Sequence, residues 1–283
     1  MTTEHKTALV LEGGAMRGLY SAGVIDVFME NNVSADVVYG VSAGALFGIN
    51  YKSRQIGRAL RYNLKYAKEK NYMGLYSLIT TGNVMNKDFC FNKLVYELDR
   101  LDFETYKNYP VEFYVVVTNL GTGKAEYIKV DDAKKDMEYF RASGSMPFVS
   151  VPVEINGNYY LDGAMGDAVP LKKAIEDNCE KIIVVLTRPQ GFRKKKSHLP
   201  YKLLYGKFPN FVEAVKSDYI RYNETMDLIE KYEQEGKIIV LRPSKFINVQ
   251  RIEKNTNKLQ SIYDLGVSDC KNKLGEIKEY LEQ

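Results

Sequence analysis

The sequence contains little histidine and cysteine and has no long uninterrupted apolar stretch. Two histidines and three cysteines occur among 283 residues. Cys90, Cys179 and Cys270 are widely spaced and form no Cys-x-x-Cys pair, so neither a disulfide framework nor a zinc site is indicated, and a reducing compartment is favoured. No segment reaches the roughly 18 apolar residues of a membrane-spanning helix, and the N-terminus lacks the apolar core of a signal peptide. We therefore expect a soluble, cytoplasmic protein that is at most peripheral to a membrane.

An excess of charge of one sign is also absent. The 40 basic and 36 acidic residues give a formal net charge of +4. This balance argues against a nucleic-acid-binding surface. It allows attraction to an anionic lipid surface without requiring it. A hydrophobic content of 45% is ample for a large buried core, and we expect a globular protein.

The segment that organises the sequence is an apolar run that turns sharply into small, helix-compatible residues. Gly40-Val41-Ser42-Ala43-Gly44 has the Gly-x-Ser-x-Gly spacing of a nucleophile elbow between a strand and a helix. Gly40 and Gly44 would allow close approach of the backbone. Ser42 would occupy a strained turn, with its Oγ presented above the end of a parallel sheet. Because the pentapeptide alone is common, its setting between strand and helix makes Ser42 the candidate nucleophile.

A glycine-rich segment, Glu12–Gly18, joins the first predicted strand to the first predicted helix. Unpaired N–H groups at a helix N-terminus favour negative charge. The segment fits neither nucleotide-binding glycine pattern, because Ala15 replaces the middle glycine of Gly-x-Gly-x-x-Gly and no Lys-Ser/Thr follows. We interpret it as an oxyanion hole formed by the N–H groups of Gly13, Gly14 and Ala15 and reinforced by that of Ala43. A nucleotide phosphate site and a turn without a chemical role are the alternatives.

Apolar strands alternate with helical segments along the chain, which predicts a parallel sheet covered on both faces by helices. We expect a strand that starts at residue 37 and runs into the elbow at 40–44, and further strands at residues 7–11, 111–118, 125–130, 181–186 and 237–241. We also expect a hairpin at 151–161 and helices at 19–30, 45–68, 88–99, 137–145, 168–178, 211–232 and from 249 onward. Residues 71–86 could line an apolar channel or form a lid, although ordinary core packing is the simpler interpretation. The basic residues 193–196 would be solvated or contact lipid headgroups.

A serine hydroxyl needs a base, and the sequence offers few. His5 precedes the first strand in a polar segment. His198 would complete a Ser, Asp, His order, but it follows the basic residues 193–196 in a segment that looks solvated. Asp162 ends a strand-like run before Gly163-Ala164, where a tight turn can leave its carboxylate facing a cleft. An ordinary Asp-Gly turn is the alternative for Asp162. A carboxylate acting directly requires that the developing oxyanion be stabilised.

Three separated segments resemble, in order, the oxyanion loop, nucleophile elbow and catalytic aspartate motif of patatin-like phospholipases. They are Gly13-Gly14-Ala15-Met16-Arg17-Gly18, Gly40-Val41-Ser42-Ala43-Gly44 and Asp162-Gly163-Ala164. Residues 19–24 and 141–147 also resemble the corresponding segments of this family, and the resemblance covers roughly residues 7–187. The sequence departs from the family where Ala15 replaces a third glycine and where Asp-Gly-Ala replaces Asp-Gly-Gly.

This resemblance implies a three-layer α/β/α fold with a mainly parallel central sheet, and hydrolysis of acyl esters of lipids by a Ser-Asp dyad without a metal or cofactor. Ser42 would be the nucleophile and Asp162 its base, and Arg17 would occupy the basic position of the loop. Residues 1–190 would form the patatin-like domain, and residues 191–283 a mostly helical region packed on it. The ligand would be a lipid or acyl ester and not a nucleic acid.

Two alternatives remain open from the sequence. One is an esterase of soluble esters with a Ser-Asp-His triad that uses His198. The other is a protein that binds lipids without turnover. The headgroup, the acyl position, the chain length and the oligomeric state have no signal in the sequence.

Overall fold

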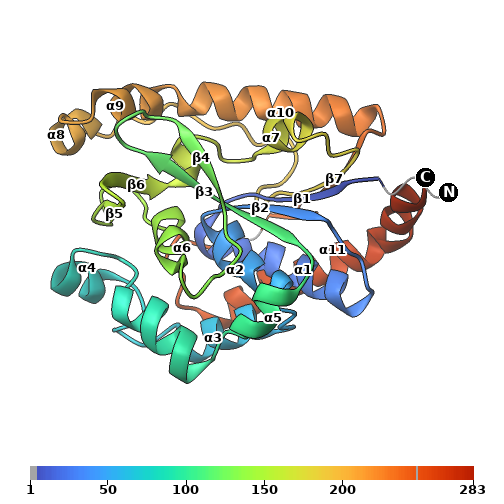
Figure 1. The fold of residues 1–283 in the computed structure, drawn as a ribbon, viewed down its shortest axis with the longest axis horizontal. Coiled ribbons are helices and arrows are strands. Elements are labelled where there is room, and N and C mark those ends of the chain that lie inside the picture. The colour runs from blue at the N-terminus through green and yellow to red at the C-terminus, as the bar shows by residue number, and fades with distance from the viewer. Residues whose placement is uncertain (1–4, 247) are drawn as a thin grey trace.

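The computed structural model describes residues 5–246 and 248–283. An eight-stranded, mainly parallel sheet lies between two layers of helices (Figure 1), so the predicted three-layer α/β fold is confirmed. Strands β3, β2, β1, β7 and β8 are neighbours in that order and run parallel. The strands are β1 Thr7–Leu11, β2 Val37–Val41, β3 Glu112–Asn119, β4 Ala125–Lys129, β5 Val153–Ile155, β6 Asn158–Asp162, β7 Lys181–Val185 and β8 Ile238–Leu241.

Strands β1, β2 and β7 are apolar at most positions because each face of the sheet carries a layer of helices. In β1, Leu9 and Leu11 belong to one core, and Ala8 and Val10 belong to the other, as alternation along a strand requires. Helices α7 and α10 cover one face, and α1, α2, α6 and α11 cover the other (Figure 1). The α-helices are α1 Leu19–Glu30, α2 Ala43–Lys52, α3 Arg58–Tyr66, α4 Leu75–Thr81, α5 Phe103–Asn108, α6 Met137–Ser143, α7 Leu171–Glu176, α8 Tyr201–Tyr205, α9 Pro209–Lys216, α10 Asp218–Gln234 and α11 Thr256–Glu282.

Three shorter or irregular helices complete the fold. Two are 3-10 helices, η1 Ala15–Gly18 and η3 Gly163–Met165, and one is a π-helix, η2 Asp88–Leu98. η2 was predicted as an ordinary helix. π-Helices are rare and frequently lie at functional sites, and η2 lines a cavity described below.

Strand β3 brings two distant segments together along one of its edges. On one edge β3 pairs with β4 over Tyr114 to Thr118. β2 and β6 must share the other edge, because each pairs with β3 residues that also pair with β4. β2 ends where Val41 lies opposite Val116, and β6 begins its pairing where Asp162 lies opposite Val117. The residue after β2 and the last residue of β6 are therefore brought to the same point of the sheet.

Two helices predicted as continuous are each divided. The predicted helix 45–68 stops at Lys52, and α3 starts after a turn in which Arg54 and Gly57 have φ of +56° and +73°. The carboxylate of Asp26 accepts the N–H of Gly57 at 2.9 Å and fixes this turn. The predicted helix 211–232 is divided at Ser217 into α9 and α10. Apolar spacing that persists across a short turn concealed both interruptions.

Other boundaries moved for local reasons. The predicted helix 168–178 begins only after Pro170. The last helix begins at Thr256, because the side chain of Asn255 accepts the N–H groups of Asn257 and Lys258 as a cap. The predicted hairpin is confirmed, and its turn residues Asn156 and Gly157 have φ of +51° and +77°, as such a two-residue turn requires.

The region beyond residue 190 contributes both a strand and a long helix. β8 extends the sheet next to β7, and α11 lies against α1 (Figure 1). A Cβ at Gly23 would lie 2.3 Å from the carbonyl oxygen of Tyr263, and one at Gly266 would lie 2.1 Å from that of Tyr20. The two helices thus approach backbone to backbone. Among the described residues, no helix combines the length and apolarity needed to cross a membrane.

Candidate active site

Ser42 stands at a strained turn between β2 and α2. Its φ and ψ are +52° and −122°, a combination that non-glycine residues adopt only when the surroundings impose it. The N–H of Ser42 donates to Ser143 Oγ at 2.8 Å, and that hydroxyl donates to the carbonyl oxygen of Val116 at 2.7 Å. Ser143 therefore ties the elbow to β3. Ser143 was not singled out from the sequence, although it lies in the segment 141–147 that supported the resemblance.

The two glycines of the elbow are required by close packing. A Cβ at Gly44 would lie 2.3 Å from the carbonyl oxygen of Leu11, and one at Gly40 would lie 2.7 Å from Cα of Ala45. Neither position could hold a side chain without moving backbone. The first turn of α2 thus lies directly on the end of β1.

Asp162 is the hydrogen-bond partner of the Ser42 hydroxyl. Ser42 Oγ donates to Asp162 Oδ2 at 2.6 Å, and the N–H of Ala164 donates to Asp162 Oδ1 at 2.9 Å. Asp162 N–H donates to the carbonyl oxygen of Ser145 at 2.8 Å, which fixes the end of β6. Ser42 and Asp162 are only 7% and 3% exposed. Burial raises the pKa of Asp162 to about 6, although the hydrogen bonds from Ser42 and Ala164 oppose this shift.

The glycine-rich loop lies against this pair. A Cβ at Gly13 would lie 2.9 Å from Cβ of Ser42, and one at Gly14 would lie 2.5 Å from Oγ1 of Thr187. Ala15, which stands where the family often has glycine, has a φ of +49°. The loop therefore keeps the left-handed conformation at Ala15 and tolerates its strain, of order 1 kcal/mol or more.

The glycine-rich loop lines the same cavity as Ser42. Gly13, Gly14, Ala15, Ser42 and Asp162 all line it. No described protein acceptor receives the N–H of Gly13, Gly14 or Ala15. The N–H of Ala43, which is the first residue of α2, also has no partner within its helix. These donors are available to a negatively charged oxygen next to Ser42.

A buried network beneath the loop holds it in place. The carboxylate of Glu12 accepts the N–H and the hydroxyl of Thr187, at 2.5 and 2.9 Å, and the hydroxyl of Tyr222 at 2.8 Å. Thr187 Oγ1 also lies 3.1 Å from the carbonyl oxygen of Gly13. Burial raises the pKa of Glu12, and these donors oppose the shift. Tyr222 belongs to α10, so a residue beyond position 190 supports the loop.

Neither histidine approaches Ser42. His198 is exposed on the segment between β7 and α8 and does not line the cavity that contains Ser42 and Asp162. His5 Nδ1 lies 2.5 Å from Glu180 Oε2, before the start of β1. Among the described residues, Asp162 is the side chain that accepts the hydrogen bond from the Ser42 hydroxyl.

Two cavities meet at Ser42, and one is almost entirely apolar. Its walls come from α2, α6, η2 and residues 72–85, and include Phe47, Met73, Val84, Phe91, Leu94 and Phe140. Part of the segment 71–86 thus lines an apolar cavity. From the sequence, ordinary core packing was the preferred interpretation of this segment and an apolar channel the alternative. Other residues of that segment, on α4, are exposed.

The second cavity is polar and holds the Ser42–Asp162 pair, the glycine-rich loop and five basic side chains, which are Arg17, Arg188, Lys194, Lys195 and Arg251. Arg188 and Arg251 have no recognisable motif in the sequence. Both cavities include Arg251. The second cavity is therefore the cationic side of the site.

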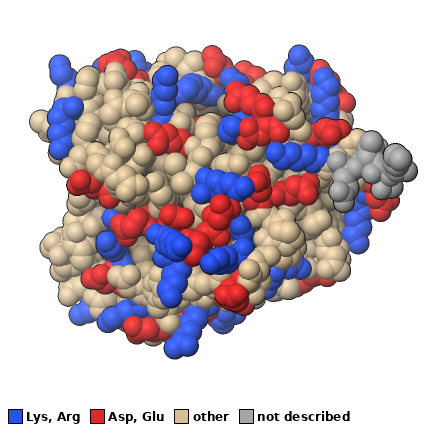
Figure 2. Space-filling model, viewed as in Figure 1, with Lys and Arg blue, Asp and Glu red and all other residues tan. Residues whose placement is uncertain are grey.

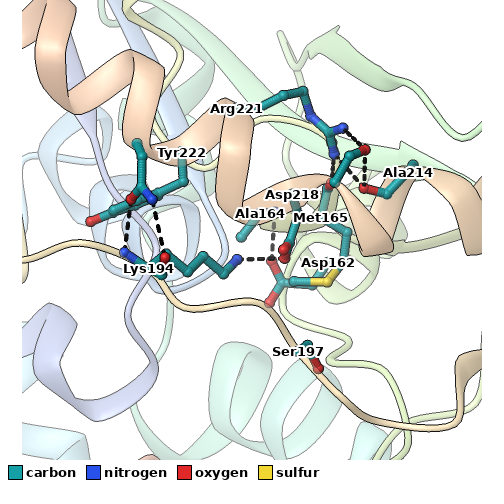
Figure 3. Close-up of polar contacts among 12 residues, drawn as sticks. Asp162, Ala164, Met165, Lys194, Ser197, Ala214, Asp218, Arg221 and Tyr222 are labelled. Atoms are coloured by element: carbon teal, nitrogen blue, oxygen red, sulfur yellow. Dashed lines mark hydrogen bonds and ion pairs between the residues drawn. The ribbon is translucent and has the colours of Figure 1, made fainter.

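The basic segment 193–196 is not simply solvated, which corrects the simpler expectation. Arg193 pairs with Glu230 and Asp227 of α10 at 3.0 and 2.8 Å. Lys194 Nζ lies 2.5 Å from Oδ2 of the buried Asp218 (Figure 3). Only Lys195 and Lys196 are exposed. Across the face drawn in Figure 2, basic and acidic side chains are interspersed, as the balanced composition predicts.

Comparisons with known proteins yielded two family models. One, described as patatin-like phospholipase, matches residues 9–175, and another, a domain of unknown function (DUF6363), matches residues 208–282. In the described part of the chain, no group of three or more His, Cys, Asp and Glu side chains is arranged to hold a metal ion.

Several individual proteins are similar as well. YjjU of Escherichia coli (strain K12), an uncharacterized protein, is 26% identical over 282 residues, which cover 92% of this chain and 75% of YjjU. Lysophospholipases NTE1 of Saccharomyces cerevisiae and Kluyveromyces lactis are 29% and 27% identical over 188 residues. These matches cover 62% of this chain but only 10% and 12% of the yeast proteins. The crystal structure of VipD from Legionella pneumophila aligns with a TM-score of 0.44 at 15% identity, over 95% of this chain and 67% of that one.

Proposed function

Because the chain belongs to the patatin-like phospholipase family, we propose that it hydrolyses carboxylic esters of lipids with a Ser42–Asp162 dyad. The observation that carries this proposal is the 2.6 Å hydrogen bond from Ser42 Oγ to Asp162 Oδ2, formed next to unpartnered backbone N–H groups and at the end of an apolar cavity. Such a constellation contains a nucleophile, its base, an oxyanion site and a place for an acyl chain.

In the first half of the reaction, Ser42 Oγ attacks the ester carbonyl carbon while its proton passes to Asp162 Oδ2. The carbonyl oxygen becomes an oxyanion that accepts hydrogen bonds from the loop N–H groups of Gly14 and Ala15 and their neighbours. The intermediate collapses, the bond to the alcohol breaks, and the proton on Asp162 passes to the departing alkoxide. The product is an acyl-enzyme at Ser42.

In the second half, a water molecule attacks the acyl carbonyl and gives its proton to Asp162. The new oxyanion uses the same N–H groups. When it collapses, the bond to Ser42 Oγ breaks, the proton returns to that oxygen, and a free fatty acid leaves. Asp162 Oδ1 keeps its bond from Ala164 N–H throughout, so Oδ2 stays directed at the reacting atoms.

The apolar cavity is the proposed site of the acyl chain. Its lining by Phe47, Phe91, Leu94 and other apolar side chains removes methylene groups from water, at about 0.8 kcal/mol for each one buried. Ligand sites of this kind combine apolar walls with a few placed polar groups. In this proposal, η2 and residues 72–85 determine the chain length that fits.

We also propose that the substrate is taken from a lipid surface. Leu75 and Ile79 of α4 and Leu203 of α8 are 70%, 76% and 82% exposed. Residues 148–151 connect these helices, because Phe148 packs on α8 and the N–H of Val84, just after α4, donates to the carbonyl oxygen of Val149. Phe148 also lines the polar cavity. The exposed apolar face therefore borders the entrance to Ser42, which is the arrangement that extraction of a lipid requires.

Residues 191–283 belong to the same functional unit in this proposal. Tyr222 supports the glycine-rich loop through Glu12, and Arg251 lines both cavities. We retain residues 1–190 as the patatin-like domain.

The test is labelling with a fluorophosphonate ester, followed by a panel of lipids with mass-spectrometric detection of the products. The unaltered protein should be labelled and release fatty acid. Ser42→Ala and Asp162→Asn should each reduce the rate by about a hundredfold or more, and His198→Ala should leave it unchanged. Loss of labelling in His198→Ala together with full labelling in Asp162→Asn would replace the dyad with a triad. Retention of lipid without labelling or turnover would indicate a binding protein.

A further inference from the structure

Three guanidinium groups gather beside the Ser42–Asp162 pair without an acidic partner among the described residues. Arg17 comes from the glycine-rich loop, Arg188 from the segment after β7, and Arg251 from the segment before α11; all line the polar cavity. Arg58, Arg61 and Arg193, by contrast, form ion pairs with carboxylates. We call Arg17, Arg188 and Arg251 the arginine cluster.

Arg17 is held in this cluster with an unused donor. Its Nε is buried and has no hydrogen-bond partner among the described residues. A buried donor left unpaired is costly, and native structures rarely keep one without a reason. Burial lowers the pKa of Arg17 to about 10, and repulsion from Arg188 and Arg251 adds to this shift, although Glu12 opposes it. The charges of Arg188 and Arg251 are therefore close enough to repel that of Arg17; Arg17 is partly buried, whereas Arg251 is exposed.

The other two cations are also positioned relative to the site. The guanidinium of Arg188 lies 4.4 Å from the ring centroid of Phe192, which itself packs edge-on against Tyr222. This stacking restricts Arg188 before any ligand arrives. Arg251 lines both the polar and the apolar cavity, so it lies where a headgroup and an acyl chain would join. The positive charges of Arg251 and Lys194 also act on Asp162.

We propose that the arginine cluster binds the phosphate group of a lipid headgroup, so that the substrates of this chain are acyl lipids with an anionic phosphate headgroup. Guanidinium groups match phosphate oxygens in charge and geometry, and a bound phosphate would relieve the repulsion within the cluster. This inference rests on the proposed hydrolase function. It also assigns a role to the region of residues 208–282, because Arg251 lies within it.

A headgroup that carries its own cation fits less well. The acidic side chains of the polar cavity are Glu12, Asp162 and Asp218. Glu12 accepts hydrogen bonds from Thr187 and Tyr222. Asp218 pairs with Lys194 through Oδ2 (Figure 3), and its buried Oδ1 has no hydrogen-bond partner among the described residues. Asp162 is bonded to Ser42. Five basic side chains line this cavity against three carboxylates, so its charge favours a phosphate headgroup without a cation over one that carries a choline ammonium.

The first experiment compares three lipids with one oleoyl chain, namely lysophosphatidate, lysophosphatidylcholine and monooleoylglycerol. The unaltered protein should show the highest kcat/KM with lysophosphatidate. Arg188→Gln and Arg251→Gln should each lower the ratio of kcat/KM for lysophosphatidate to kcat/KM for monooleoylglycerol about tenfold, because the neutral lipid has no phosphate to lose. The control is Arg100→Gln, because Arg100 is exposed and lines neither cavity. An equal loss on all three lipids, or no preference for lysophosphatidate, would overturn the proposal.

A second experiment separates this proposal from that of the hydrolase. Fluorophosphonate labelling and hydrolysis of a short neutral ester report on Ser42 without a headgroup. If both occur and no headgroup preference is found, only the arginine-cluster proposal fails; if neither occurs, the hydrolase proposal fails. Calorimetric binding to Ser42→Ala does not depend on turnover. Tighter binding of lysophosphatidate than of inorganic phosphate, weakened by Arg251→Gln, supports a lipid headgroup. Equal binding of the two, or binding that Arg251→Gln leaves unchanged, overturns it.

Discussion

The rate of ester hydrolysis should fall at acid pH with the titration of one buried carboxyl group, that of Asp162. Its pKa is raised to about 6, chiefly by burial. A base must be ionised to accept the proton of Ser42, so kcat/KM should be constant above pH 7 and decline through pH 6. At pH 5 a group with pKa 6 is ionised to only about one tenth, whereas a carboxyl with the ordinary pKa of about 3.9 is ionised to more than nine tenths.

The assay is hydrolysis of a short 4-nitrophenyl ester between pH 4.5 and 9, stopped with alkali so that released nitrophenol is measured at one pH. We expect kcat/KM at pH 5 to be about a tenth of its plateau. Samples returned from pH 5 to pH 7.5 should regain full activity, which separates titration from unfolding. A profile that stays flat to pH 5 would refute the argument that burial controls this carboxyl.

The control for this profile is His198→Gln, because an unperturbed histidine titrates at about 6.5, close to the expected limb. His198 is exposed and lines neither cavity, so the limb should remain in the variant. If the limb disappears in His198→Gln, the base is the imidazole and the dyad is wrong.

Three further predictions concern the surroundings of this pair. Ser143→Ala removes the acceptor of the Ser42 N–H and the donor to Val116, and should lower kcat about tenfold and the free energy of unfolding by about 1–3 kcal/mol. In the control Ser145→Ala, the lost hydroxyl donates to the carbonyl oxygen of Arg141, so kcat should be kept. Equal kcat in the two variants would contradict a positioning role for Ser143. Lys194→Gln removes a cation that lowers the pKa of Asp162, so the acid limb of the pH–rate profile should move to higher pH. The melting temperature should drop because Asp218 loses its partner, and adding Asp218→Asn should restore it. An acid limb that does not move would count against an electrostatic effect of Lys194 on Asp162. Leu203→Ser and Ile79→Ser, both on the exposed apolar face, should lower activity on phospholipid vesicles several-fold and leave hydrolysis of the short ester unchanged. The control Leu98→Ser should change neither activity. An equal loss on both substrates would argue against docking to a lipid surface.

Local backbone chemistry explains why much of the fold was predictable. The alternating apolar strands, the elbow at Ser42 and the turn at Asn156–Gly157 are specified by neighbouring residues, so a short segment contains the needed information. The breaks at residues 53–57 and at Ser217 were missed because apolar spacing continues across them. At the first break, the fixing contact comes from Asp26, which is distant in sequence.

The site divides in the same way. Ser42, Asp162 and the glycine-rich loop carry motifs, whereas the roles proposed for Ser143, Arg188 and Arg251 depend on where the fold places them. An isolated arginine in a polar stretch gives no sign that it will lie next to two others. Arg188 follows β7, and Arg251 lies between β8 and α11; the pairing of β7 with β1 and β8 and the packing of α11 on α1 bring both near Arg17.

In the proposed dyad a carboxylate takes the place of the usual histidine, and the register of β3 accounts for its position. β2 and β6 occupy the same edge of β3 and end at Val116 and Val117, which brings Asp162 to Ser42 without an intervening group. Burial at this point raises the pKa of Asp162. A carboxylate with a higher pKa is a stronger base, so the proton transfer from the Ser42 hydroxyl to Asp162 costs less free energy. Donors from the loop receive the charge that forms on the substrate as the proton moves. A direct Ser-Asp pair therefore depends on both conditions, so a variant that exposes Asp162 to water should lose rate even if its hydrogen bond to Ser42 is kept.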